Sequence, residues 1–111
     1  QLRAEYQSQI ADADQFINNR QYIEARDTYD RILRLEPNFE DVIEAREKLY
    51  SKLMTEAKTI FQESLIYESV SDIDEAIDGY RKTKDLLTNV SHPIAVEYYK
   101  KALFQLKKLQ K

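Results

Sequence analysis

Residues 13–37, which read ADQFINNRQYIEARDTYDRILRLEP, are the stretch that decides the fold. Apolar side chains recur every three or four residues on both sides of the polar segment 18–21, which is the spacing of an amphipathic helix. Pro37 ends the second stretch, because the residue before a proline is disfavoured in the helical conformation. The segment therefore predicts two packed helices joined by a turn in which Asn18 or Asn19 adopts the left-handed conformation.

The same period continues through the rest of the 111 residues. It predicts five helices, over residues 2–18, 22–35, 39–67, 72–87 and 93–110. The third would be nearly thirty residues long, about twice the usual length, since residues 39–67 contain no Pro, Gly or Asn. A sheet needs many turns, and one glycine with two prolines cannot supply them. The predicted fold class is all-α, built from antiparallel helix hairpins.

Several single residues carry more local predictions. Ser71 is expected to cap the helix over 72–87, and Pro93 suits the first position of the last helix. Gly79 lies in mid-helix, where it either permits a close helix contact or is tolerated at a cost of about 1 kcal/mol relative to Ala. The only histidine, His92, is expected to be an exposed loop residue. Periodicity also turns three further apolar side chains inward: Tyr67, Ile73 and Ile94.

The segment 13–37 resembles a tetratricopeptide repeat. That family places small and aromatic residues at fixed positions of a helix pair closed by proline, and here those positions hold Ala13, Phe16, Tyr22, Ala25, Tyr29 and Pro37. Residues 53–87 resemble a degenerate, lengthened copy with Ala57, Phe61, Ala76 and Tyr80. Residues 93–110 would form a C-terminal capping helix. The resemblance implies one domain over 1–111, arranged as a right-handed superhelix of about five helices.

The family binds a peptide or helix in a groove lined by the first helix of each pair. Carried onto this sequence, the partner-binding residues are Gln7, Ile10, Asp14, Ile17, Asn18, Lys48, Ser51 and Lys52. The mixed character of these side chains indicates a partner with apolar and basic features. Chaperone-binding members clamp a C-terminal carboxylate with Lys and Asn, but Ile10 and Asp14 stand at those places. We therefore expect no chaperone-tail binding.

Composition argues against other classes of function. The chain has no cysteine, one histidine and no glycine-rich phosphate loop, so we expect neither an enzyme nor a metal or cofactor site. A net charge of −3 does not favour nucleic acid, and no apolar run reaches the roughly 18 residues of a membrane span. The expected location is the cytoplasm, with the periplasm as the alternative.

The sequence thus predicts a scaffold or adaptor module that binds another protein. The alternative is a structural homo-oligomerisation domain, in which the long helix and the face of Tyr98 and Tyr99 pair between two copies. These adjacent tyrosines cannot both face inward, so one of them is expected at the surface or in an interface. Because the chain opens at Gln1 and not at Met, we expect a fragment of a longer protein.

Overall fold

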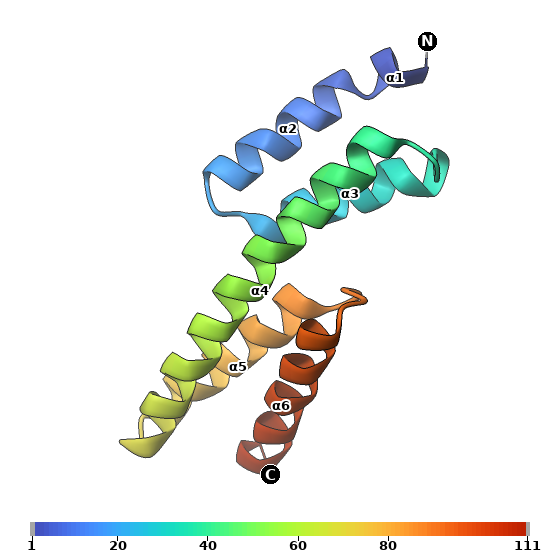
Figure 1. Ribbon diagram of the computed structural model, residues 1–111. Helices are drawn as coiled ribbons and strands as arrows, with labels where there is room; N and C mark the ends of the chain where they lie inside the picture. Colours follow the sequence, from blue (N-terminus) through green and yellow to red (C-terminus); the bar gives the residue numbers. More distant parts are fainter. Residues whose placement is uncertain (1, 111) are drawn as a thin grey trace. The chain divides into compact units, whose positions relative to one another are not determined.

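The computed structural model describes residues 2–110, leaving out the side chains of Leu2 and Arg3 (Figure 1). Within this range the chain is all-helical and contains no strand, so the predicted all-α class and the helix hairpins are confirmed. The right-handed superhelix stays a prediction. The helices are α1 (Leu2–Glu5), α2 (Gln7–Asn18), α3 (Tyr22–Leu35), α4 (Glu40–Ser69), α5 (Ile73–Leu87) and α6 (Pro93–Leu109).

The contacts divide the chain into two compact units, which we call unit 1 (Gln1–Lys52) and unit 2 (Leu53–Lys111). The boundary falls inside α4, whose 30 residues match the predicted long helix. Unit 1 holds α1, α2, α3 and the first part of α4, and unit 2 holds the rest of α4 with α5 and α6. A single domain over 1–111 stays a prediction, and the two units are described separately below.

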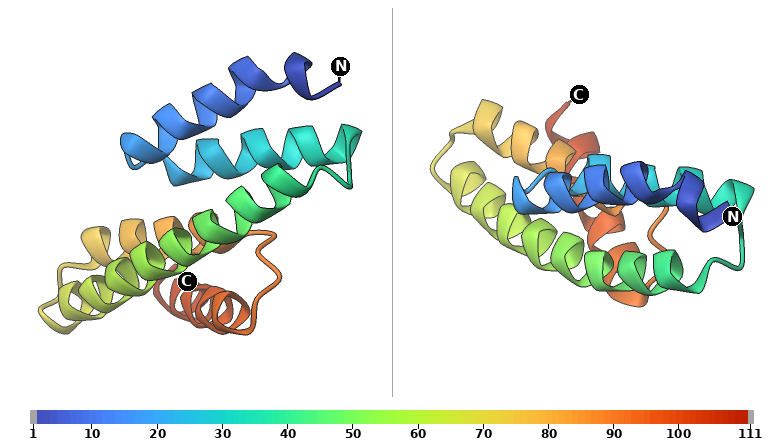
Figure 2. Two further views of the ribbon diagram at one scale, coloured as in Figure 1. Left: turned by 45° about the horizontal axis from the view of Figure 1, so that its top comes forward. Right: turned by 90° about the horizontal axis from the view of Figure 1, so that it is seen from above.

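In unit 1, α2 and α3 form an antiparallel pair around two small residues (Figure 2). Ala13 and Ala25 are fully buried, and this lets the two backbones approach closely. Tyr29 is buried beside them. The Tyr6 ring lies 6.0 Å from the Phe39 ring, which brings the start of α2 next to the residue that precedes α4.

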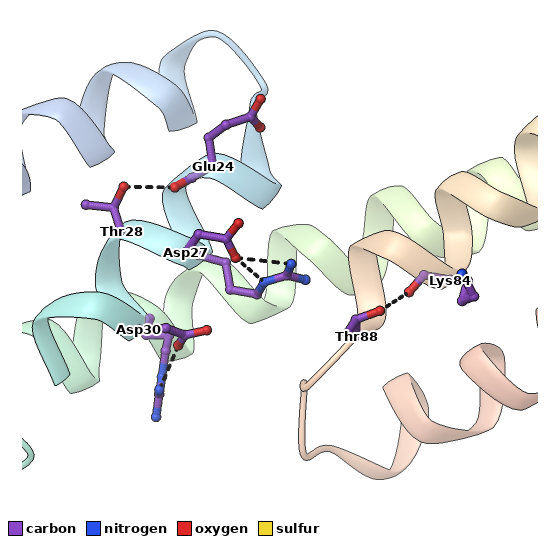
Figure 3. A network of polar contacts seen from close by, with 8 residues as sticks. Glu24, Asp27, Thr28, Asp30, Lys84 and Thr88 are labelled. Carbon is purple, nitrogen blue, oxygen red and sulfur yellow. Dashed lines mark hydrogen bonds and ion pairs between the residues drawn. The ribbon is translucent and has the colours of Figure 1, made fainter. Parts of the chain in front are cut away.

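Polar groups in the helices and at their ends find local partners. The buried Thr28 hydroxyl donates to the Glu24 carbonyl at 2.9 Å, and in unit 2 the Thr88 hydroxyl donates to the Lys84 carbonyl at 2.8 Å (Figure 3). Such bonds satisfy a hydroxyl that has left water. In unit 1 an ion pair with a distance of 3.0 Å from Arg46 to Asp30 also joins α4 to α3.

Three predictions about helix ends are wrong. The N-terminal helix is interrupted at Tyr6, whose backbone (φ −100°, ψ 0°) separates α1 from α2. In the next turn Arg20, not an asparagine, has the left-handed φ of 60°. Ser71 does not cap α5 but has a φ of 64° at the end of α4, and Asp72 takes the capping position without a side-chain hydrogen bond. Where a chain must reverse within two or three residues, the geometry of the turn overrides side-chain preference.

In unit 2, the second part of α4 packs on both α5 and α6. The buried core cluster consists of Phe61, Ala76, Tyr80, Ala102 and Leu106. The Phe61 ring lies 5.5 Å from the rings of both Tyr80 and Tyr98, and it meets Tyr98 edge to face. All four residues that resemble a second repeat are therefore buried, three of them in this cluster.

The surface of unit 2 departs from the prediction at three positions. Tyr67, Ile73 and Ile94, expected to face inward, are 41%, 36% and 39% exposed. Tyr67 and Ile73 flank the turn between α4 and α5, where no neighbouring helix covers them. In the last helix Ala95, not Ile94, is buried. Periodicity finds a helical face, but only the neighbouring helices decide how far along the helix that face is covered.

The loop before α6 is more ordered than expected. Pro93 is the first residue of α6, as predicted, and His92 is half-buried at the N-cap. The Nδ1 atom of His92 accepts from the amide of Ile94 at 3.4 Å. His92 is therefore a capping residue and not an exposed loop histidine.

Candidate functional site

The residues predicted to bind a partner all lie in unit 1, on two helices. On α2, Gln7, Asp14 and Asn18 are exposed, whereas Ile10 and Ile17 are half-buried. On α4, Lys48, Ser51 and Lys52 are exposed, and the Lys48 ammonium lies 3.6 Å from Glu44.

Both helices run away from the end at which Tyr6 meets Phe39 (Figure 2). At about 1.5 Å of rise per residue, Lys48 and Ile17 are each some 14–17 Å along their helices from that contact. The predicted binding residues of α2 and those of α4 thus lie at similar distances along their helices. That they line one common groove stays a prediction.

Unit 2 has two apolar hollows on α6 that the sequence analysis did not find. The loop hollow, of about 460 Å³, lies between the loop at residues 87–91 and α6, from which Val96, Tyr99, Lys100 and Leu103 line it. Its lining is mainly apolar. Tyr99 is thus the outward member of the predicted tyrosine pair, while Tyr98 packs on Phe61.

The second hollow, the α4–α6 groove, also measures about 460 Å³. It is lined by Phe61 and Leu65 from α4 and by Lys100, Lys101, Phe104 and Gln105 from α6. Phe104 is 67% exposed, which is unusual for a phenyl ring on a well-packed helix. The Gln105 Oε1 atom is buried there without a hydrogen-bond partner. The groove is therefore mainly apolar, with two lysines of α6 in its lining.

Charged groups beside the groove hold its wall in place. The Lys101 ammonium lies 2.9 Å from Glu97 and 4.8 Å from the centre of the Tyr98 ring. Its hydrogen bond with Glu97 raises the pKa of Lys101, so the ammonium stays charged at neutral pH. The Lys58 ammonium lies 5.7 Å from the same ring centre. The Tyr98 ring is thus already in contact with Phe61 and with two lysine ammonium groups of the same chain.

A second polar network joins the three helices of unit 2. The Tyr80 hydroxyl donates to Glu68 at 2.7 Å, and the Lys108 ammonium lies 3.0 Å from the other oxygen of that carboxylate. The hydrogen bonds from Tyr80 and Lys108 lower the pKa of Glu68. Burial, with the nearby carboxylate, raises the pKa of Tyr80, which therefore remains a donor at every physiological pH.

This network predicts acid sensitivity. The folded pKa of Glu68 lies below its ordinary value of 4.5, so its stabilisation is complete above that pH and is lost as the pH falls through the folded pKa. Glu68→Gln should cost roughly 1–3 kcal/mol near neutral pH, and the difference from wild type should shrink as the pH falls below 4.5. Urea unfolding of both proteins at each pH measures this difference in the free energy of unfolding. Glu63→Gln, on the exposed surface of α4, is the control. A cost for Glu68→Gln that is independent of pH would contradict this role.

Other kinds of site receive no support from the described residues. In residues 2–110, no group of three or more His, Cys, Asp or Glu side chains is placed to hold a metal ion. None of the helices in that range has the length and apolar character needed to cross a bilayer. Comparisons with protein-family models, curated proteins and solved structures gave no match. The tetratricopeptide resemblance of residues 13–37 therefore stays a prediction.

A signal for the hollows was present in the sequence. Val96, Tyr99 and Leu103 recur at three- and four-residue steps on α6, beside the core stripe of Ala95, Ala102 and Leu106. A helix with two apolar stripes has more apolar surface than one neighbour covers. Sequence reasoning missed Leu65 because its contribution depends on α4 lying beside α6.

Proposed function

We propose that this chain is a protein-interaction module, a scaffold or adaptor that binds a peptide or helix of a partner protein. One observation carries the proposal. Among the described residues, nine large apolar side chains are exposed, and eight of them lie in unit 2; Leu35 is the exception. A concentration of this kind marks an interaction surface more often than scattered single residues do.

The shape of the hollows favours a peptide as the occupant. Each is open to solvent along α6, and each is large enough for one or two apolar side chains. Another protein, rather than nucleic acid, is the partner we propose, because the chain carries a net charge of −3. The absence of cysteine is compatible with action in the cytoplasm or the periplasm. The eight residues of α2 and α4 named from the family resemblance remain a second candidate surface.

Selection of peptides from a displayed random library tests this function. We expect peptides that bind the full chain saturably with micromolar affinity, and Phe104→Ser should weaken them roughly tenfold or more, because an aromatic anchor in a pocket dominates such contacts. Leu35→Ser is the matched control, since Leu35 is 68% exposed and Phe104 is 67% exposed. Ile17→Glu and Lys52→Glu report on the surface of unit 1. Failure to select any saturable binder would contradict the proposed function.

Homo-oligomerisation is a second candidate, favoured by one feature. Ile66, Tyr67, Val70 and Ile73 form a run of exposed apolar residues around the turn between α4 and α5. Tyr98, in contrast, is already packed within the chain and has little surface left for a second copy. Light scattering across a hundredfold range of concentration separates the two functions. A constant mass of 13.2 kDa is expected for the interaction module, and a mass that doubles would favour the oligomer.

A further inference from the structure

The outward face of α6 presents a defined chemical pattern. The loop hollow and the α4–α6 groove lie on the two sides of Lys100, which lines both of them. Val96 in the first hollow and Phe104 in the second are eight residues apart, or about 12 Å along the axis. The pattern is therefore apolar, cationic and apolar over about two helical turns.

Among the described residues Lys100 has no anionic partner, whereas two other lysines of α6 do have one. Lys101 is paired with Glu97, and Lys108 with Glu68. Lys100 forms no ion pair with another described residue, and neither hollow is lined by an Asp or a Glu. An exposed ammonium between two apolar hollows attracts an anion, and the hollows attract apolar side chains. The complement of this face is thus an acidic amphipathic segment.

We propose that this face of α6 binds an acidic amphipathic helix of another protein, with one apolar side chain in each hollow and a carboxylate on Lys100. The inference rests on the proposed function and specifies its site and partner. A helix with apolar residues at positions i and i+7 and Asp or Glu at i+4 meets these requirements. The three positions share one face of the helix and span about 11 Å.

A second copy of this chain is a poorer occupant. A two-fold dimer formed through this face places Lys100 of each copy near the symmetry axis, where a residue faces its own counterpart. Two ammonium groups close to that axis repel each other. The same charge that favours an acidic partner therefore disfavours self-association here.

Three synthetic helical peptides test the inference against the full chain. They share an Ala/Gln background with Leu at i and i+7 and differ only at i+4, where they carry Glu, Gln or Lys. Fluorescence anisotropy should give the highest affinity for the Glu peptide, roughly two- to fivefold above the Gln peptide, and the lowest for the Lys peptide. Lys100→Glu should weaken the Glu peptide roughly tenfold and reverse the order. Phe104→Ser should weaken all three peptides.

Lys82→Glu is the matched control, because it makes the same charge change at an exposed position of α5 away from both hollows. Equal effects of Lys100→Glu and Lys82→Glu would overturn the site, as would the absence of binding by all three peptides. Library peptides that bind but are weakened only by Ile17→Glu or Lys52→Glu would overturn the site and leave the proposed function standing. A doubling of mass that Phe104→Ser abolishes would assign the face to a second copy instead.

Discussion

Phe61→Ala is expected to lower the free energy of unfolding of unit 2 by about 3–5 kcal/mol, the range for removing a buried phenyl ring. The Phe61 ring contacts Tyr80 on α5 and Tyr98 on α6, each at 5.5 Å between ring centres. One side chain of α4 thus holds both other helices of the unit. Its loss leaves a cavity between three helices and removes two aromatic contacts.

Urea unfolding of the full chain, followed by circular dichroism, measures this loss. Hydrogen exchange shows which helices are destabilised. The amides of α5 and α6 should lose more protection than those of α2 and α3. Phe104→Ala provides a matched control, because it deletes the same ring from the same unit at a position that is 67% exposed. We expect a change within about 0.5 kcal/mol for the control, as for other surface substitutions. Similar losses for the two variants would show that the Phe61 cluster does not stabilise unit 2.

Gly79→Ala is expected to destabilise the chain by about 1–3 kcal/mol, although Ala is the better helix former. A Cβ atom at position 79 would overlap Ser64 Oγ and would lie 3.1 Å from Ser64 Cβ. Ser64 is buried, and its hydroxyl donates to the Ile60 carbonyl at 2.7 Å. The side chain therefore has little room to move away, and α4 and α5 would have to separate.

Double variants identify the cause. Ser64→Ala removes the worst overlap in the Gly79→Ala background but leaves two Cβ atoms 3.1 Å apart, so it should restore only part of the stability. Ser64→Gly removes both overlaps and should restore more of the interhelical contact. The gain in stability is offset by about 1 kcal/mol, the cost of a glycine inside a helix. Thermal unfolding of the wild type, the three single variants and the two double variants gives the two coupling energies. Additive effects at positions 64 and 79 would show that the two residues do not share this contact.

The sequence identified the helices well because their signals are local. The 3.6-residue period predicted α3 and α5 to within one residue of each end, and the proline at 93 fixed the start of α6. The small and aromatic residues of the repeat resemblance, such as Ala57 and Tyr80, are buried as expected. The close approach expected as one alternative for Gly79 is present against Ser64. The helix periods and the proline signal lie within a few neighbouring residues, whereas the contact of Gly79 with Ser64 joins two helices.

The candidate binding surface was less accessible to prediction. The family resemblance directed attention to α2 and the first part of α4, whereas most of the exposed apolar side chains lie in unit 2. The apolar stripe of Val96, Tyr99 and Leu103 is readable from sequence, but its exposure is not. Whether a stripe is core or surface depends on the presence of a neighbouring helix.

By itself, the sequence of this protein determined an all-α chain, the positions of its helices and the small and aromatic residues at its helix contacts. These follow from hydrogen bonds and side-chain spacing within each turn, which do not depend on distant residues. Only the tertiary structure decided the left-handed turns at Arg20 and Ser71, the pairing of Glu68 with Tyr80 and Lys108, and the groove of Leu65 with Phe104. The turns arise where consecutive helices meet, and the polar pairing and the groove arise where helices pack together, because burial and shape are properties of the assembled fold.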